Sequence, residues 1–141
     1  MSLKGKFDEL EVPEEGRRLV LAPDHANVLL TSEKYAAALY ADKNSGKISG
    51  ILAGFKTYSY VGNPHYTAAG AKLAYGAVPG PTDKKASIAF YEDNVGKKTG
   101  ILKQYYDKPD TTGQSHRLNY RHYFIVLPIR LEAIGAIVTG A

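Results

Sequence analysis

The stretch Val12–Leu30, VPEEGRRLVLAPDHANVLL, carries the clearest folding signals of the chain. Its apolar run predicts a short strand over 18–22, which ends at Pro23 because proline has no amide hydrogen to donate to a sheet. Asp24 is then placed to cap a helical segment over 25–41, rich in helix-forming residues, which forms either one helix or two helices separated near Thr31 and Ser32. A strand followed directly by a helix predicts a domain in which helices pack against a sheet.

Further strands are predicted downstream of this stretch. Residues alternate over 52–61 and 118–126 with the period of two that is typical of a half-buried strand. Short apolar runs predict three more strands, over 86–91, 101–107 and 133–138. The sequence therefore indicates an α+β fold with a mixed or antiparallel β-sheet flanked by helices.

The domain is predicted to cover residues 12–141 as a single unit, because a chain of 141 residues fits one hydrophobic core. Residues 1–11 are charged and poor in apolar side chains, and they are expected to be a tag-like or disordered lead. Residues 62–85 are rich in glycine and proline, which predicts a long loop. Long loops in compact domains are often functional, so this segment is a candidate contact region.

The composition excludes several kinds of protein. Hydrophobic residues make up 44% of the chain, enough for a core, yet no apolar run is long enough to cross a membrane. Cysteine is absent, which excludes disulfides, thiolate metal sites and cysteine nucleophiles. The net charge of +4 permits contact with a polyanion without requiring it. The 11 tyrosines are expected on half-buried sheet faces and at subunit contacts, because the ring is apolar and the hydroxyl polar.

No arrangement of residues in the sequence points to catalysis or to a bound cofactor. The glycine motifs that bind phosphates and dinucleotides are missing. His116 and His122 are six residues apart on a predicted strand, a distance of about 20 Å, which is too long for one metal ion. Asp24 and His25 are expected to form a helix cap beside a surface imidazole. The sequence therefore predicts that the chain is not an enzyme and has no cofactor and no metal site.

Several short motifs follow one another in an order that resembles a known protein family. They begin with VPEEGRRLVLAP, continue with GKISGILAGFKTYSY and ASIAFYED, and close with YRHYFIVLPIRLEAIGAIV. In this succession, residues 12–139 resemble the C-terminal half of the major capsid proteins of tailed phages and prophages with the HK97 fold. The residues that carry the resemblance are Val12, Pro13, Gly16, Arg17, Pro23, Gly50, Gly54, Phe55, Tyr58, Ser59, Leu131, Ala133, Ile134, Gly135 and Ala136.

The resemblance implies the axial domain of a capsid subunit, as a fragment of a longer protein that also has an N-terminal arm and a spine helix. It implies three partners: other copies in the pentamers and hexamers of an icosahedral shell, a scaffold protein, and double-stranded DNA packaged non-specifically. No membrane is involved, and the implied location is the virion capsid, after synthesis in a bacterial host cytoplasm. The candidate interface residues are Arg17, Arg18, Asn63, Pro64, His65, Pro79, Pro81, Arg117, Tyr120, Arg121 and Tyr123.

Two other hypotheses stay open. A tyrosine-rich sheet is also typical of a protein-interaction module, in which tyrosine and arginine side chains form a subunit contact. Tyrosines that alternate with Arg117 and Arg121 are also typical of a single-stranded nucleic-acid-binding domain, where bases stack on aromatic rings. The nucleic-acid hypothesis predicts an affinity that falls steeply with salt and depends on Tyr120 and Arg121.

Overall fold

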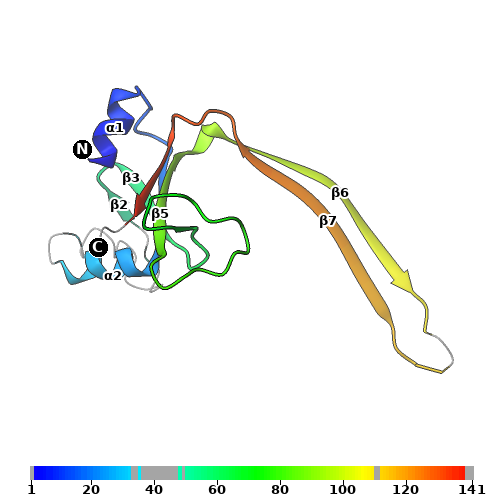
Figure 1. Ribbon diagram of the computed structural model, residues 1–141. Coiled ribbons are helices and arrows are strands. Elements are labelled where there is room, and N and C mark those ends of the chain that lie inside the picture. Colours follow the sequence, from blue (N-terminus) through cyan, green and yellow to red (C-terminus); the bar gives the residue numbers. More distant parts are fainter. Residues whose placement is uncertain (1, 33–34, 36–47, 49, 110–111, 139–141) are drawn as a thin grey trace. The chain divides into compact units, whose positions relative to one another are not determined.

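The computed structural model divides the chain into two compact units (Figure 1). Unit 1 comprises Met1–Asn94 and Arg130–Ala141, and unit 2 comprises Val95–Ile129. Unit 2 thus lies inside the range 12–141, over which the sequence predicts one domain. The residues described by the structure are 2–32, 35, 48, 50–109 and 112–138. The elements in chain order are α1 (Leu3–Glu9), β1 (Arg17–Leu21), α2 (Pro23–Thr31), β2 (Gly50–Leu52), β3 (Phe55–Ser59), β4 (His65–Tyr66), β5 (Lys84–Tyr91), the 3-10 helix η1 (Glu92–Asn94), β6 (Val95–Asp107), β7 (Arg117–Pro128) and β8 (Ile134–Val138).

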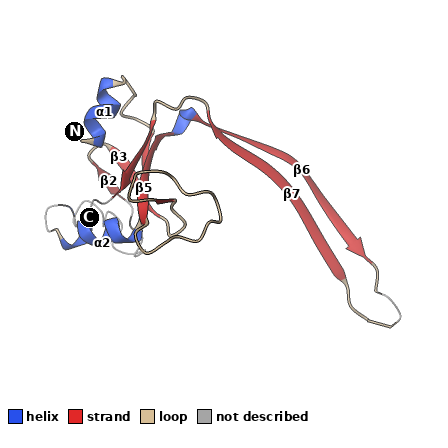
Figure 2. Ribbon diagram, viewed as in Figure 1, coloured by secondary structure: helices blue, strands red, loops and turns tan. Residues whose placement is uncertain are grey.

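Unit 1 is built on a six-stranded mixed sheet (Figure 2). Strands β2, β3, β1, β5 and β4 follow one another across the sheet, and β8 pairs with β5. Strands β1 and β3 are parallel, with Arg18 opposite Lys56, whereas the other pairings are antiparallel. The strands predicted over 18–22, 86–91 and 133–138 correspond to β1, β5 and β8. The prediction of an α+β fold with a mixed sheet and helices is confirmed.

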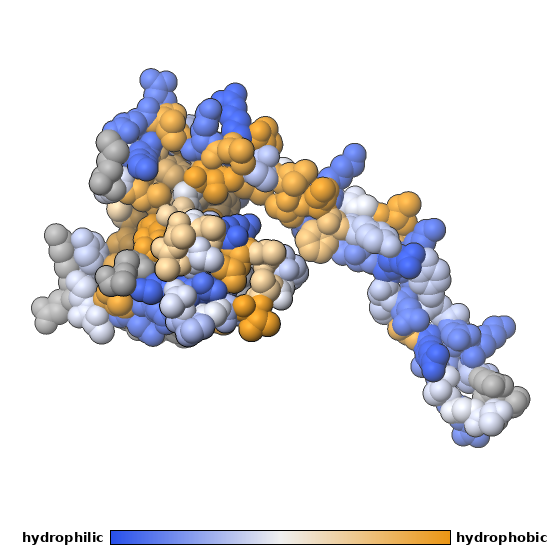
Figure 3. Space-filling view, in the orientation of Figure 1, coloured by the Kyte–Doolittle hydropathy of each residue, from blue (hydrophilic) through white to orange (hydrophobic). Residues whose placement is uncertain are grey.

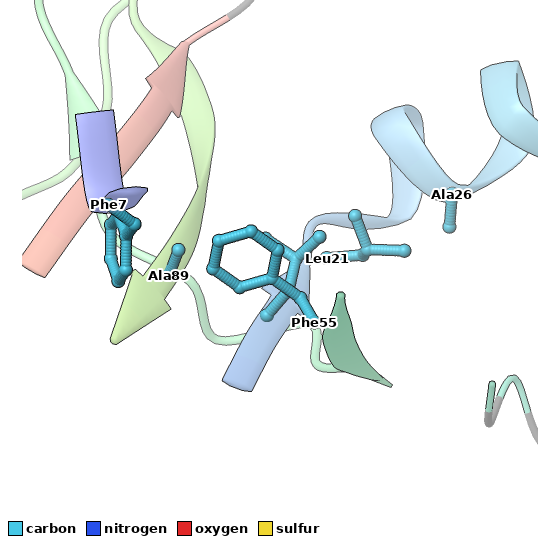
Figure 4. Packing of buried hydrophobic residues seen from close by; sticks show 6 residues of the cluster. Phe7, Leu21, Ala26, Phe55 and Ala89 are labelled. Atoms are coloured by element: carbon cyan, nitrogen blue, oxygen red, sulfur yellow. The ribbon is translucent and has the colours of Figure 1, made fainter. Parts of the chain in front are cut away.

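The hydrophobic core of unit 1 joins one face of the sheet to α1 and α2 (Figure 4). Every second side chain of β1 is buried, so Leu19 and Leu21 face the core while Val20 between them is partly exposed. The rings of Phe7 from α1 and Phe55 from β3 meet edge to face, with centroids 5.2 Å apart. The buried members of this cluster are Phe7, Leu19, Leu21, Ala26, Phe55 and Ala89.

Helix α1 corrects the prediction of a tag-like or disordered lead over 1–11. The Ser2 hydroxyl caps this helix by accepting a hydrogen bond from a backbone amide at 3.2 Å. Phe7 is 2% exposed and anchors the helix in the core. The helix also approaches β8 closely, because a Cβ built on Gly135 would lie 2.6 Å from the Leu3 side chain. This segment therefore belongs to the folded unit.

Helix α2 begins directly after β1 with Pro23, which suits a first turn because its amide would have no partner there. The residue at the cap position is Ala22, not Asp24 as the sequence predicts. Asp24 lies in the first turn, where its negative charge interacts favourably with the helix dipole. The helix ends at Thr31, and most of the remainder predicted over 25–41 lies outside the described residues.

Strands β2 and β3 replace the single strand predicted over 52–61. A tight turn separates them at Ala53 and Gly54, whose φ angles are 50° and 86°. Positive φ angles at both turn residues match the twist of a two-residue hairpin, and glycine is the residue that adopts them without strain. The predicted alternation holds within β3, where Phe55 and Thr57 are buried.

The segment 62–85, predicted as a long loop, contains β4 and the beginning of β5. The two strands pair antiparallel, with His65 opposite Lys85. Beyond β4 the chain folds back, and the Leu73 amide donates a hydrogen bond to the His65 carbonyl at 2.9 Å. A further bond, from the Ala86 amide to the Pro64 carbonyl at 3.0 Å, ties the start of this segment to β5. Part of the loop is therefore held by backbone hydrogen bonds.

Unit 2 is a two-stranded antiparallel ribbon of β6 and β7, named the hairpin below (Figure 2). The strands predicted over 101–107 and 118–126 are confirmed, and they are longer in the structure, with 13 residues in β6 and 12 in β7. At about 3.4 Å per residue, the paired strands are roughly 40 Å long. The register shifts once, between Thr99 and Leu102.

Candidate functional site

The hairpin has two faces, and the strand register assigns its side chains to them. Residues that pair directly across the ribbon point to the same side, whereas neighbours along a strand point to opposite sides. A bulge places both Gly100 and Ile101 opposite Tyr123. The apolar face carries Val95, Lys97, Thr99, Leu102, Gln104, Tyr106, Leu118, Tyr120, His122, Phe124, Val126 and Pro128. The mixed face carries Gly96, Lys98, Lys103, Tyr105, Asp107, Arg117, Asn119, Arg121, Tyr123, Ile125 and Leu127.

Large hydrophobic side chains predominate on the apolar face, and they are open to solvent. Phe124 is 62% exposed and Leu102 is 65% exposed. The Phe124 ring has two neighbours on this face: the His122 ring at 5.7 Å between centroids, and the Lys97 ammonium at 5.7 Å. All of β7, and all of β6 except Val95, are exposed. The hairpin therefore presents apolar side chains that nothing within it covers (Figure 3).

The mixed face carries a cationic and aromatic cluster in the half that is nearest the turn of the hairpin. Arg121 lies between Tyr105 and Tyr123, with its guanidinium carbon 5.9 Å and 5.8 Å from the two ring centroids. Lys103 is directly opposite Arg121 in the register. Asp107 is the one carboxylate among the residues assigned to this face. A surface of this kind can bind carboxylates, phosphates or stacked bases.

The length and exposure of the hairpin limit its stability in isolation. A two-stranded ribbon is marginally stable at best in water, because it has no core to bury. Its outer edges also carry backbone groups that can pair with another chain, since the described residues form only two strands there. The geometry therefore favours a role in which contacts outside the hairpin cover its faces and stabilise it.

The excess positive charge of the chain is concentrated in the hairpin. Residues 95–129 contain six lysines and arginines and two aspartates. Their net charge is +4, which equals the net charge of the whole chain. The remaining residues contain twelve basic and twelve acidic side chains. The hairpin is therefore the part of the chain most suited to an anionic partner.

Four of the residues predicted as interface contacts lie on the hairpin, and all four are exposed. Arg117, Arg121 and Tyr123 share the mixed face, whereas Tyr120 is on the apolar face. Phe124 and the other large apolar residues of that face are exposed too, although the sequence did not predict them as contacts. The alternation over 118–126 predicts the two faces correctly, but its interpretation as a half-buried strand is wrong for this chain.

Arg17, also predicted as an interface contact, is instead buried inside unit 1. Its side chain is 1% exposed and lies 5.8 Å from the ring centroids of both Phe7 and Phe55. The guanidinium donates to the Asp8 carboxylate at 2.6 Å and to the Pro13 carbonyl at 2.9 Å. Arg17 therefore joins the turn before β1 to the core, and its prediction as a contact residue is corrected.

Arg18 points to the other side of β1, where it is engaged by neighbours in its own unit. Its guanidinium donates to the Glu92 carboxylate, and this hydrogen bond raises the pKa of Arg18. It also donates to the Tyr58 hydroxyl at 3.3 Å. The Arg18 side chain remains partly exposed, so a partner could still reach it.

The remaining predicted contacts lie in the segment 62–85 and differ in exposure. Asn63 is buried, and its side-chain amide donates to the Val20 carbonyl at 3.3 Å, so it fixes the loop to β1 instead of facing a partner. Pro64 and His65 are partly exposed and line a pocket of about 400 Å³. Pro79 and Pro81 are exposed.

A buried pair of polar side chains links α2 to β5. His25 Nδ1 lies 2.6 Å from the Ser87 hydroxyl, which also accepts a hydrogen bond from the Ala22 amide at 2.9 Å. The prediction of a surface imidazole at His25 is therefore wrong. Because Ser87 is fully buried, a substrate could not reach its hydroxyl, and the pair is structural. Over the described ranges, no group of three or more histidines and carboxylates could hold a metal ion.

Comparisons with known proteins relate the chain to a phage protein through its fold. No protein-family model and no curated protein matches the sequence. A solved structure of a chain from Mycobacterium phage Che8 matches with 17% sequence identity and a TM-score of 0.59. The match covers 94% of this chain and 44% of that chain, so this chain spans less than half of that structure's length. The fold is therefore one that a phage protein also uses.

The described residues thus offer exposed side chains that a partner could contact. Unit 1 holds its polar buried groups in structural hydrogen bonds, and the hairpin exposes apolar, aromatic and cationic side chains. None of the helices that the structure describes is long and apolar enough to cross a membrane.

Proposed function

We propose that this chain is the axial-domain part of a tailed-phage major capsid protein with the HK97 fold, and that its function is assembly. Copies of the subunit associate into pentamers and hexamers of an icosahedral shell that encloses double-stranded DNA. The order of the sequence motifs supports this proposal, and so does the fold shared with a chain from a phage.

The observation that carries the proposal is the uncovered hairpin. Its strands run for roughly 40 Å at the usual rise per residue, and their large hydrophobic side chains face solvent on both sides. Large hydrophobic side chains gathered on an exposed surface mark a binding site, since exposing them to water is unfavourable. An arm of this kind is well suited to contacts with neighbouring subunits.

The composition of the hairpin fits a protein interface. Tyrosine, phenylalanine and arginine are enriched in interface centres, and the two faces combine Tyr120 and Phe124 with Arg121 and Tyr123. A shell needs the same contact many times, so each contact can be weak and the sum still strong. The positive charge of the hairpin would also favour non-specific contact with packaged DNA.

Electron microscopy of the complete natural gene product, expressed alone, tests the assembly function. We expect closed shells or regular capsomers. Small monodisperse particles from the complete gene product would contradict the capsid proposal.

A pair of hairpin substitutions tests whether the apolar face makes the contacts. Replacing Leu118 and Phe124 with serine should weaken self-association in sedimentation velocity by about tenfold or more, because interface anchors dominate binding energy. The matched control replaces Val28 and Val78, two exposed apolar residues of unit 1, with serine, and should associate like the unmodified chain. Equal effects in both variants would sink the proposed interface.

Substitution Arg121→Glu probes the mixed face. We expect unit 1 to stay folded, as judged by circular dichroism, while self-association falls. The reason is that the guanidinium over its two tyrosine rings is replaced by a carboxylate, which the electron-rich ring faces repel. Loss of the folded signal would instead mean that Arg121 is a structural residue.

Single-stranded nucleic-acid binding is a second candidate function, favoured by the cluster of Arg121 with Tyr105, Tyr123 and Lys103. It predicts that fluorescence anisotropy with a short oligonucleotide detects binding that falls steeply between low and high salt. The variant Arg121→Glu should abolish that binding. Oligonucleotide affinity that is independent of salt or of Arg121 would remove this candidate.

A further inference from the structure

One end of the sheet in unit 1 carries a cluster of basic side chains. His65 and Lys85 lie directly opposite each other on β4 and β5, while Tyr66 is opposite Lys84 and forms an isolated bridge with Lys72. His65, Lys72 and Lys85 line the pocket of about 400 Å³. No carboxylate lines that pocket, and over the described residues these lysines form no ion pair. Lys72 and Lys85 thus share one pocket without a counter-ion among the described residues, so an anionic occupant would stabilise them.

The cationic pocket has a defined shape before any partner arrives. The Leu73 amide donates to the His65 carbonyl at 2.9 Å, and the Ala86 amide donates to the Pro64 carbonyl at 3.0 Å. The Thr67 amide and hydroxyl both bond to Ala71, which closes the adjacent turn. Preorganisation of this kind lowers the entropic cost of binding.

The opposite end of the same sheet carries an acidic turn, residues 9–15, between α1 and β1. Glu9, Glu11, Glu14 and Glu15 are all exposed there, and one of them, Glu14, is paired with a lysine of unit 1 at 3.4 Å. This turn is also held in place, because the Arg17 guanidinium donates hydrogen bonds to the Val12 and Pro13 carbonyls. It therefore presents carboxylates on a fixed backbone.

The strand register keeps the two charged ends apart. Arg17, directly after the acidic turn, pairs with Tyr91 at the end of β5, whereas Lys85 of the pocket is near the start of β5. Lys85 and Tyr91 are six positions apart on β5, which corresponds to about 20 Å. The two ends therefore cannot neutralise each other within one chain.

We propose that the cationic pocket binds the acidic turn of a second copy of this chain, in a head-to-tail contact. One feature favours a second copy over another anion: the cationic pocket and the exposed acidic turn are both present on each chain, and their charges are complementary. A contact between different patches of identical subunits is heterologous, and it closes into a ring when the rotation permits. This inference rests on the proposed assembly function and names a surface for it in unit 1.

Charge-swapped variants test this contact by sedimentation velocity at low salt. One variant carries Lys72→Glu and Lys85→Glu, and the other carries Glu11→Lys and Glu15→Lys. Each variant alone should associate about tenfold more weakly than the unmodified chain, because its two ends now have the same sign. An equimolar mixture should recover the original association, because each reversed end then meets a complementary end on the other variant. Circular dichroism and thermal unfolding of each variant establish that it is folded.

The outcomes separate this inference from the proposed function. If the unmodified chain associates and neither variant weakens it, or if the mixture fails to recover, the contact is wrong while assembly stands. If the unmodified chain and the complete gene product both stay monomeric, the assembly function itself fails, and this inference with it. If the variant with Lys72→Glu and Lys85→Glu loses oligonucleotide binding but associates normally, the pocket binds a phosphate backbone and the inference is overturned.

Discussion

The two units of this chain share strand alternation but differ in what covers it. In unit 1, every second side chain of β1 is buried, and Leu19 and Leu21 pack in the core with the helices. Burying each leucine contributes about 1.5–3 kcal/mol to the stability. In the hairpin, Phe124 and its neighbours alternate in the same way and remain exposed. We therefore expect the stability of the isolated chain to reside in unit 1, while the apolar side chains of the hairpin stay exposed, as the proposed assembly function requires.

The largest expected change in the free energy of unfolding comes from replacing one phenylalanine in each unit and comparing the two. Phe55→Ala should lower the free energy of unfolding by about 3–5 kcal/mol, because it empties a buried site that contacts Phe7. Phe124→Ala should change it by about 0.5 kcal/mol or less, because that ring is exposed. Urea unfolding followed by circular dichroism measures both values. A large effect of Phe124→Ala would break the contrast between the units.

Arginine substitutions within β1 should give the next largest effect. Arg17→Ala leaves carbonyl groups of the preceding turn without their buried donor, and we expect a loss of about 2–3 kcal/mol. Arg17→Lys should recover little of this stability, since a lysine ammonium cannot reproduce the separate hydrogen bonds that the planar guanidinium donates to Asp8 and Pro13.

The matched control for Arg17 is its neighbour. Arg18→Ala should have little effect on unfolding, because Arg18 is partly exposed and its partner Glu92 is exposed, so solvent screens the pair. If the two alanine variants unfold alike, Arg17 is not the structural residue described above.

A smaller effect is expected at the turn between β2 and β3. Ala53→Gly should raise the unfolding free energy by about 0.5–1 kcal/mol, because glycine relieves the strain of a φ angle of 50°. Gly54→Ala, at a φ angle of 86°, should lower it by about 1 kcal/mol. Thermal unfolding distinguishes the opposite signs, and two shifts of the same sign would contradict the turn geometry.

The smallest effect concerns alkaline pH. The Tyr91 hydroxyl donates to the Asp93 carboxylate at 2.9 Å, and this bond raises the pKa of Tyr91 above its ordinary value near 10. A raised pKa means that the protonated form stabilises the folded state. Its contribution is therefore present below about pH 10 and is lost as the pH rises through the pKa of the folded state.

Unfolding midpoints measured from pH 8 to pH 11 should therefore fall less steeply in Tyr91→Phe than in the unmodified chain. Tyr106→Phe is the control in the hairpin, where the hydroxyl lies 2.7 Å from His116 Nδ1. It should leave the profile unchanged, because the hairpin contributes little to unfolding. If the unfolding midpoint depends on pH in the same way in Tyr91→Phe and in the unmodified chain, the hydrogen bond from Tyr91 to Asp93 does not contribute to stability.

Much of unit 1 could be predicted because local patterns and burial agree there. The run around Leu19 and Leu21 and the stop at Pro23 are short-range signals, and β1 forms within one residue of the predicted limits. Helix α1 was missed because a single buried side chain, Phe7, anchors it among charged neighbours. The burial of Arg17 was also missed, because it depends on a turn and two aromatic rings brought together by the fold.

The candidate site was only partly predictable. Alternation assigns Tyr120 and Arg121 to opposite faces, yet it cannot tell whether another element covers either face. The length of β6 was underestimated because Gly96, Lys97, Lys98 and Gly100 are poor strand signals, and cross-strand pairing with β7 overrides them. The cationic pocket depends on the pairing of β4 with β5, which no local pattern in the sequence reveals.

Hydrogen exchange of the hairpin amides tests the central claim most directly. In dilute protein, the amides of β6 and β7 should exchange far faster than those of β1 and β5, because no core protects them. At concentrations where the chain associates, exchange in the hairpin should slow by about 100-fold or more as contacts cover it. Hairpin amides that are already protected in the dilute chain, or that stay unprotected after association, would contradict the account of the hairpin as an assembly arm.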